Sequence, residues 1–177
     1  FILHALAWLS ETGCAAIVCF PGIFYRKGAE QKIRQYLVDN NRVDAVIDLP
    51  ANLFFGTSIA TTILVLRKNK KNDNGVLFIS GSDEFVKDGN KNKLTDENID
   101  NIFKLYTERK TVEYKARLVP YEEIVRNAYN LSVTTYVDTT PPAPPKDLKA
   151  ITARVEAATK ETDKCRAVVA KILKELA

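Results

Sequence analysis

The chain has 177 residues, of which 46% are hydrophobic and 27% are charged. This is the composition of a globular protein with a buried core, and it excludes wholesale disorder. The length allows one domain of ordinary size and an appendage, and the net charge of +4 permits a nucleic-acid partner without requiring one, since solubility alone accounts for it.

The cysteine and histidine content predicts no metal centre. Cys14, Cys19 and Cys165 lack metal-ligand spacing, and the chain has a single histidine. An odd number of cysteines without a paired framework indicates a reducing compartment, so we expect a cytoplasmic protein in which Cys14 and Cys19 pack as small hydrophobic residues. No segment approaches the ~18 apolar residues of a membrane span, so no membrane partner is expected. Because methionine is absent, we expect the chain to be a piece of a longer protein.

The first part of the chain alternates helix and strand patterns. Apolar residues at helical spacing predict a helix over residues 1–10, and the run AAIVCF predicts a buried strand over residues 15–20. Residues 28–40 return to helical spacing, with one face expected to point inward and the other outward. The inward residues are Ile33, Tyr36 and Leu37, and the outward residues are Lys32, Arg34 and Gln35. The next strand covers residues 43–49, and the strand–helix–strand order predicts that the two strands pair in parallel.

The chain is organised around Val43–Lys68, which reads as two apolar strands joined by residues 51–60. The connection is too short for a helical crossover, so the strands are expected to be antiparallel. It places Phe54 and Phe55 beside Gly56 at the end of a sheet, where α/β folds build their sites. The two aromatic residues either stack on a flat ligand such as a base or fill the core, and the residues alone leave both readings open.

The next part of the chain is more polar. Residues 76–80 predict a short strand, and residues 81–94 predict a loop. A helix is expected to begin at Thr95, because Asp96 and Glu97 suit the positive end of a helix dipole. The residues expected to face inward from this helix are Ile99, Ile102, Phe103 and Tyr106. A short helix over residues 121–127 and an extended segment up to residue 140 follow.

The run PPAPP at residues 141–145 marks a semi-rigid linker between two parts of the chain. Residues 146–177 then carry apolar residues at alternating steps of three and four, the seam of a long helix that packs on another. The larger seam residues are Leu148, Ile151, Val155, Val169, Ile172 and Leu176. The middle of the seam is thin, which favours a mixed bundle with a different protein or docking on the chain's own domain over a homodimer.

Two groups of basic residues are candidates for phosphate contacts: Arg26 with Lys27, and Arg67 with Lys68. The alternative is that both groups are ordinary solvated surface. The sequence has no Gly-rich phosphate loop, HExxH motif or cysteine cluster, so the residues by themselves indicate the C-terminal part of an α/β domain and a docking helix, with no specific chemistry.

Several segments, in order, resemble the methyltransferase (modification) subunit of type I restriction–modification systems. The segments are AAIVCFP (15–21), FYRKGAEQKIRQYL (24–37), residues 43–68, GNKNKLTDENIDNIFKLY (89–106) and YNLSVTTYVD (129–138). The resemblance implies an α/β fold: the C-terminal part of a Rossmann-like methyltransferase sheet with a reversed last strand, followed by a long C-terminal helix. The expected domains are residues 1–140 for the methyltransferase portion and residues 146–177 for subunit docking.

The family transfers a methyl group from S-adenosylmethionine to the exocyclic amine of adenine in duplex DNA, and the target base must leave the stack to be reached. The resemblance implies that Phe54 packs on the flipped adenine, with Phe55 as the second candidate. The family's glycine-rich cofactor loop and Asn-Pro-Pro-aromatic motif are absent from this chain, so we assign it no catalytic residue and expect it to be inactive alone.

The resemblance also implies duplex DNA, a specificity subunit and a restriction subunit as partners, with the heptad helix docking on the specificity subunit. Two alternatives stay open. One is a non-catalytic interaction module with a degenerate methyltransferase fold that assembles through this helix. The other is a related adenine methyltransferase with fused specificity, in which the helix packs within its own chain.

Overall fold

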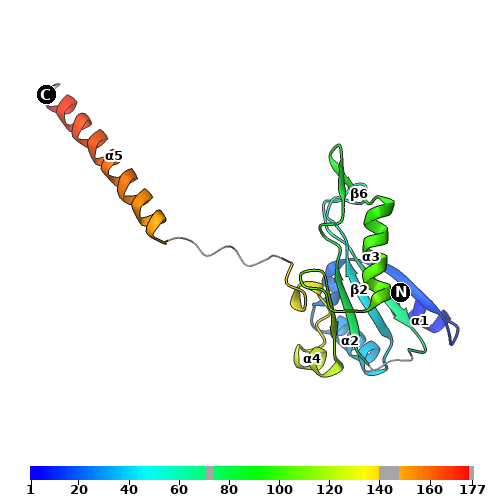
Figure 1. Ribbon diagram of the computed structural model, residues 1–177. Helices are drawn as coiled ribbons and strands as arrows, with labels where there is room; N and C mark the ends of the chain where they lie inside the picture. The colour runs from blue at the N-terminus through cyan, green and yellow to red at the C-terminus, as the bar shows by residue number, and fades with distance from the viewer. Residues whose placement is uncertain (71–73, 140–147, 176–177) are drawn as a thin grey trace. The chain divides into compact units, whose positions relative to one another are not determined.

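The computed structural model describes residues 1–70, 74–139 and 148–175 (Figure 1). The chain divides into two compact units, Phe1–Thr140 and Pro141–Ala177, which we describe separately. The predicted Pro-rich linker at residues 141–145 and the last seam residue, Leu176, lie outside the described residues.

The first unit is built on a five-stranded, mostly antiparallel sheet with the strand order β1-β3-β2-β4-β7. The strands are β1 (Cys14–Cys19), β2 (Val43–Asp48), β3 (Thr62–Arg67), β4 (Val76–Ser80) and β7 (Ala116–Val119). β3 is antiparallel to both β1 and β2, β2 is parallel to β4, and β7 is antiparallel to β4. The predicted antiparallel pairing of the strands at residues 43–49 and 61–66 is therefore confirmed.

The predicted parallel pairing of the first two strands is wrong. β1 and β2 run in the same direction, but β3 lies between them. The burial of each strand gives the reason. β1 is covered on one face only, with Val18 exposed, which suits the edge of the sheet, whereas Leu64, Val65 and Leu66 bury both faces of β3. The expectation that the strand at residues 15–20 is buried is corrected for the same reason, since only Cys19 of β1 is buried.

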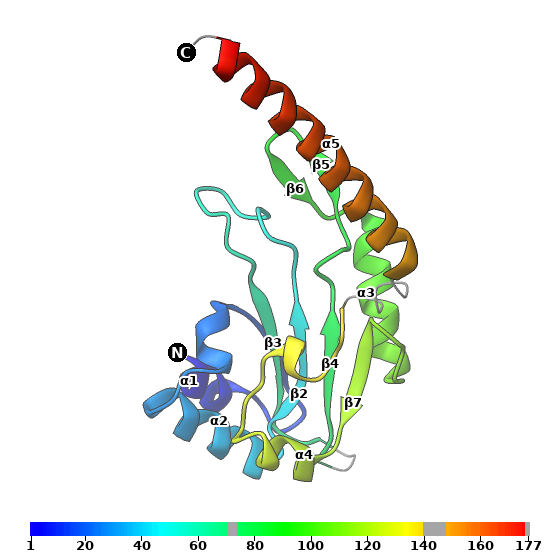
Figure 2. The same ribbon diagram turned by 90° about the vertical axis from the view of Figure 1, so that its left-hand side faces the viewer.

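Helices cover both faces of the sheet (Figure 2). On one face lie α1 (Ile2–Trp8), the 3₁₀ turn η1 (Pro21–Phe24), α2 (Ala29–Asp39), α4 (Tyr121–Arg126) and the 3₁₀ turn η2 (Val133–Thr135). On the other lies α3 (Asp96–Glu108). Each face of the sheet has its own hydrophobic core, and successive residues of β2 point into opposite cores. Val46 packs in the core under α2, and Ile47 packs in the core under α3.

The predicted helix start at Thr95 is confirmed, since its side chain forms a capping box with Asn98. The inward face of α3 was only partly predicted. Ile102 is buried, but Ile99 and Phe103 are exposed, because α3 meets the sheet along the stripe of Ile102, Leu105 and Tyr106.

In α2 the expected orientations of Arg34 and Tyr36 are reversed, with Arg34 buried and Tyr36 exposed. The Arg34 guanidinium donates hydrogen bonds to the carbonyl oxygens of Ile23 and Tyr129, both at 2.7 Å, which offsets the cost of burying it. Cys14 is also exposed, contrary to expectation, whereas Cys19 is buried.

Three strands were not predicted. β7 pairs with β4 at the sheet edge, and residues 81–94 contain a hairpin of β5 (Val86–Asp88) and β6 (Lys91–Lys93) in place of the expected loop. The hairpin turns at Gly89, which has a φ of +59° that glycine adopts without strain.

The described part of the second unit is the 28-residue helix α5 (Leu148–Glu175). At about 1.5 Å per residue it is about 42 Å long.

Candidate functional site

A cleft opens at the edge of the sheet where β1, β2 and β4 end. These strands run in the same direction, so the residues that end or follow them meet at one edge. Most of the polar lining consists of hydroxyl groups, so we refer to it as the hydroxyl cleft. Its lining residues are Pro21, Phe24, Asp48, Leu49, Ala60, Thr62, Ser80, Ser82, Ser132, Thr134 and Thr139.

Asp48, the last residue of β2, is the one ionisable group in the hydroxyl cleft. Burial raises the pKa of its carboxyl group, and the hydrogen bond that the Thr62 hydroxyl donates to Oδ1 at 2.7 Å opposes this only in part. Beside it, the backbone amide of Gly81 donates to the Asp48 carbonyl oxygen at 3.0 Å. A Cβ at Gly81 would lie 2.7 Å from that oxygen, so only glycine allows this approach.

The Ser80 and Ser82 hydroxyl oxygens are 3.1 Å apart in the hydroxyl cleft, and those of Ser132 and Thr134 are 3.2 Å apart. Hydroxyl groups both donate and accept hydrogen bonds. This lining suits the edge of a neutral polar ring better than a phosphate, for which cationic groups would be expected.

The two predicted base-stacking residues lie on the connection between β2 and β3, which we call the aromatic loop (residues 51–60). Phe55 is fully exposed and Phe54 is 41% exposed, so neither fills the core. Leu53 instead packs against the core under α3 and anchors the loop. The aromatic loop thus leaves both rings accessible at the edge that holds the hydroxyl cleft.

The β5–β6 hairpin holds the aromatic loop in place. The backbone amide of Asn92 donates to the carbonyl of Asn52 at 3.0 Å, and its side-chain amide donates to the carbonyl of Ala51 at 2.7 Å. The Lys91 ammonium donates to the carbonyls of Phe54 at 3.0 Å and Thr57 at 3.4 Å. Sequence reasoning missed this support because a polar hairpin has no hydrophobic periodicity.

The structure does not bring the four predicted phosphate-binding residues together. Arg26 and Lys27 are exposed after η1, near the end of β1, with the Arg26 guanidinium 5.9 Å from the centre of the Phe20 ring. Arg67 and Lys68 lie at the end of β3, which is the opposite edge of the sheet because β3 is reversed.

Both residues of the second pair have partners in the structure. Lys68 donates to the Leu9 carbonyl at 2.7 Å and lies 3.3 Å from the Glu11 carboxylate. Arg67 belongs to a buried network that sequence reasoning missed, which we call the Asp44 cluster. Its members are Asp44, Arg67, Tyr106 and Arg109.

At the centre of the Asp44 cluster, the Asp44 side chain is only 4% exposed. It accepts hydrogen bonds from Arg67 Nε at 3.0 Å, the Tyr106 hydroxyl at 2.7 Å and Arg109 Nη1 at 2.9 Å. Burial raises the carboxyl pKa, but the Tyr106 and Arg67 hydrogen bonds and the positive charge of Arg109 outweigh it, so the pKa lies below its usual range. The sequence signal that could have indicated this cluster is an aspartate, Asp44, inside the apolar run of a predicted strand.

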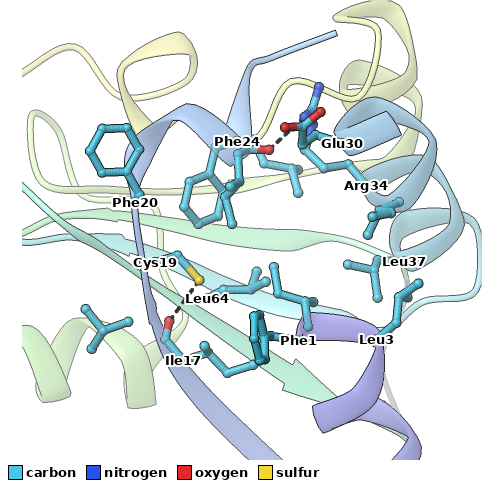
Figure 3. Close-up of a pocket in the computed structure, with 15 residues that line it drawn as sticks. Phe1, Leu3, Ile17, Cys19, Phe20, Phe24, Glu30, Arg34, Leu37 and Leu64 are labelled. Atoms are coloured by element: carbon cyan, nitrogen blue, oxygen red, sulfur yellow. Dashed lines mark hydrogen bonds between the residues drawn. The ribbon is translucent and has the colours of Figure 1, made fainter. Parts of the chain in front are cut away.

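A second, apolar pocket lies between α1, β1 and α2 (Figure 3). Ile17, Cys19, Phe24 and Leu64 are among its lining residues, and its charged members are Glu30 and Arg34. Arg34 is committed to backbone carbonyls, so this pocket offers packing surface and no arrangement of reactive groups.

The predicted docking residues of α5 are exposed where the structure describes their side chains. Ile151, Val155, Val169 and Ile172 are between 39% and 59% exposed. Leu148 begins the helix, but its side chain is outside the described part, as is Leu176.

Within residues 1–70, 74–139 and 148–175, no group of three or more His, Cys, Asp or Glu side chains is placed to hold a metal ion. None of the helices in this described part has the length and apolar character needed to cross a bilayer.

The N-6 DNA methylase family model matches residues 1–143. The chain therefore belongs to the N-6 DNA methylase family. Within the family it is similar to methylase subunits of type I restriction enzymes. It is 46% identical over 156 residues to the MpnII methylase subunit of Mycoplasma pneumoniae, covering 88% of this chain and 29% of that protein. It is 41% identical over 128 residues to the MjaVIII methylase subunit of Methanocaldococcus jannaschii, covering 70% of this chain and 22% of that protein.

The chain thus spans less than a third of the length of these curated relatives. The fold agrees with the sequence comparison. The crystal structure of the type I restriction-modification system methyltransferase subunit from Streptococcus thermophilus matches 77% of this chain with a TM-score of 0.75 and 43% identity, covering 29% of that chain. The M protein of the type I restriction enzyme EcoKI matches with a TM-score of 0.66 at 18% identity, which shows the fold alone.

Proposed function

We propose that this chain is part of the methylase subunit of a type I restriction–modification complex, which transfers a methyl group from S-adenosylmethionine to the exocyclic amine of adenine in duplex DNA. The observation that carries the proposal is the accessible aromatic loop beside the hydroxyl cleft, in a chain of the N-6 DNA methylase family. Residues 1–140 are the portion of the methyltransferase domain, and residues 146–177 are the docking segment, of which the structure describes α5 at residues 148–175.

In this proposal the sheet is the C-terminal part of a Rossmann-like methyltransferase sheet, and β3 is its reversed strand, which β4 and β7 follow in the chain and extend on the far side of β2. The placement of β3 between β1 and β2, antiparallel to both, supports this reading. The aromatic loop immediately precedes β3, so a base held by it sits at the edge where β1 and β2 end.

Methyl transfer to a base in a duplex requires the base to leave the stack. In our proposal the Phe54 ring packs on the face of the extruded adenine, with Phe55 as the second candidate. The hydroxyl cleft presents hydroxyl donors and acceptors to an adjacent ring edge. Because no lysine or arginine is among its described lining residues, the cleft suits an uncharged base better than a phosphate.

S-adenosylmethionine supplies the methyl group when bound. The sequence contains neither a Gly-rich loop after a strand nor an Asn-Pro-Pro-aromatic motif, so we assign no residue of this chain to the cofactor or to amine activation. We infer that this chain alone is inactive, and that its share of the reaction is to hold the extruded base.

The partners in this proposal are duplex DNA and the specificity and restriction subunits of the complex. The exposed seam of α5 supports docking on a specificity subunit, because apolar residues at heptad spacing are covered when a helix packs on another.

The test uses the full-length protein assembled with its specificity subunit, labelled S-adenosylmethionine and duplex DNA carrying the target site. We expect N6-methyladenine in the digested DNA. We expect Phe54→Ala to lower the rate about 5- to 150-fold, since stacking on an aromatic ring is worth about 1–3 kcal/mol per base. Phe103→Ala, which removes an exposed ring from α3, is the matched control.

Two results would change this conclusion. No methyl transfer by a folded, assembled complex would leave a non-catalytic interaction module as the better description. A loss of activity in Phe55→Ala but not in Phe54→Ala would move the base contact to Phe55.

Docking is tested separately by replacing Val155 and Ile172 of α5 with aspartate. The charged seam is expected to abolish co-purification of the specificity subunit, because burying an unpaired carboxylate in an apolar interface is strongly unfavourable. Full retention of the subunit by this variant would overturn the docking role.

A further inference from the structure

The β5–β6 hairpin extends past the ends of the main strands and lies beside the aromatic loop (Figure 2). It contains only three residues in each strand, and β5 is exposed along its whole length. An isolated two-stranded hairpin is at best marginally stable in water. Its position therefore depends on the contacts it makes with the rest of the molecule.

Those contacts are concentrated on the aromatic loop. Asn92, the one buried residue of the hairpin strands, is bonded through backbone and side chain to Asn52 and Ala51. The Lys91 ammonium donates hydrogen bonds to the backbone carbonyls of Phe54 and Thr57. These two bonds fix the stretch of backbone that carries both aromatic residues. Any group bound by the aromatic loop consequently has the hairpin as its neighbour.

The charges of the hairpin are unbalanced. Residues 86–93 contain three lysines and one aspartate. Lys91 is used by the aromatic loop, whereas Lys87 and Lys93 are exposed and form no ion pair with the residues that the structure describes. The Lys87 ammonium lies over the ring of Phe85, 5.5 Å from its centre.

We propose that the β5–β6 hairpin is a DNA-backbone contact, in which Lys87 and Lys93 bind phosphates flanking the base held by the aromatic loop. This inference rests on the proposed function. A base drawn out of a duplex stays attached to its own phosphates, so a cationic element beside the base-binding loop meets the backbone. Lysine contacts of this kind contribute affinity without reading sequence.

The proposal separates two roles within the hairpin. Lys91 and Asn92 are positioning residues that act through the aromatic loop, while Lys87 and Lys93 touch the nucleic acid. The previously considered pair Arg67 and Lys68 lies at the other end of the sheet and is engaged with protein groups. The hairpin therefore offers accessible cations at the edge where the aromatic rings are exposed.

The test compares DNA binding by the full-length assembled complex and by its Lys87→Gln/Lys93→Gln variant over a range of salt concentrations. The slope of log K against log salt is negative, and each lost phosphate contact reduces its magnitude by about 0.9. The slope of the double variant should therefore be smaller in magnitude by about 1.8. At about 0.15 M salt this corresponds to about 30-fold weaker binding, equal for specific and unrelated sequences. The matched control is Lys104→Gln/Lys110→Gln, which removes the same charge from exposed positions in and just after the C-terminal half of α3.

An unchanged slope in the hairpin variant, or an equal loss in the control, would overturn the proposal. Methyl transfer is measured on the same preparations and answers a different question. If the unmodified complex binds DNA with the expected slope difference but transfers no methyl group, the hairpin contact stands and the proposed enzymatic function fails. If the unmodified complex methylates DNA but the hairpin variant has the same salt slope, the proposed enzymatic function stands and the hairpin contact fails.

Discussion

Replacing Asp44 by asparagine is expected to destabilise the first unit by about 3 kcal/mol, because it removes the charge that holds the Asp44 cluster together. Breaking a buried ion pair by removing one partner costs about 3–5 kcal/mol. The arginine side chains are partly solvated, with Arg67 39% and Arg109 24% exposed, so water compensates them in part and the lower end of the range applies.

The assay is thermal unfolding of the full-length protein at several pH values. A loss of about 3 kcal/mol lowers the Tm of the transition of this unit by about 6–12 °C. The matched control is Glu11→Gln, which removes a carboxylate that is 81% exposed and paired with Lys68 at 3.3 Å. A surface pair of this kind contributes about 0–1 kcal/mol, so the control should unfold close to the wild type.

The pH dependence gives a second check on the Asp44 cluster. The carboxyl pKa is lower in the folded protein than in the unfolded chain, so the unfolded state binds more protons as the pH falls. The stabilisation is fully present above about pH 4 and is lost as the pH falls through the folded pKa. The gap between wild type and Asp44→Asn should therefore narrow in acid. Equal Tm values for the Asp44 and Glu11 variants, or a gap that persists unchanged down to about pH 2, would refute the reasoning.

Three further predictions concern two other buried polar residues, Arg34 and Asn92, and the partly buried Asp48. Arg34→Met should lower the free energy of unfolding, measured in urea, by about 2–4 kcal/mol, because two carbonyl oxygens lose their hydrogen-bond donor. The control is Lys32→Met, which changes an exposed residue of the same helix. A similarly small effect of the two substitutions would contradict the prediction. Asp48→Asn should gain stability relative to wild type as the pH rises above about 4. The raised pKa makes the folded state bind more protons than the unfolded chain, so wild-type stability falls until the pH has passed the folded pKa of Asp48. Urea titrations at each pH measure the free energy of unfolding, and parallel pH profiles of the two proteins would rule the prediction out. Asn92→Ala should speed amide hydrogen exchange in residues 51–57 by about 5- to 10-fold, since hydrogen bonds of about 1 kcal/mol that hold the aromatic loop are lost or weakened. Asn90→Ala, at the exposed hairpin turn, should leave the exchange rates unchanged. Unaltered exchange in the Asn92 variant would remove the hairpin's positioning role.

The strands and helices that were predicted correctly are those with a strong hydrophobic pattern. The runs at residues 43–49, 61–66 and 76–80 and the capped helix that begins at Thr95 all appear where expected. These signals are local, because burial of an apolar face imposes its period on the neighbouring residues. β7 has only four residues, too few to show a period, and the strands of the β5–β6 hairpin are short and mostly polar, so this signal was absent for them.

The site was predictable only as far as the position of Phe54 and Phe55 at a strand end. That both rings are accessible follows from the burial of Leu53 and from the bonds made by Asn92, which lies about forty residues further along the chain. The hydroxyl cleft likewise combines residues from distant segments, so the position of Asp48 in the apolar run at residues 43–49 could not show which groups surround it.

By itself, the sequence determined the α/β pattern of the first unit, the antiparallel return of β3, the heptad helix and the resemblance to type I modification subunits. Tertiary structure alone decided that β3 separates β1 from β2, that Arg34 is buried, and that Asp44 is the centre of a charged network. The physical reason is the range of the interactions. Periodicity reports which face of an element avoids water, whereas a buried charge is stable only with partners that the fold supplies, and those of Arg34 include a carbonyl 95 residues away.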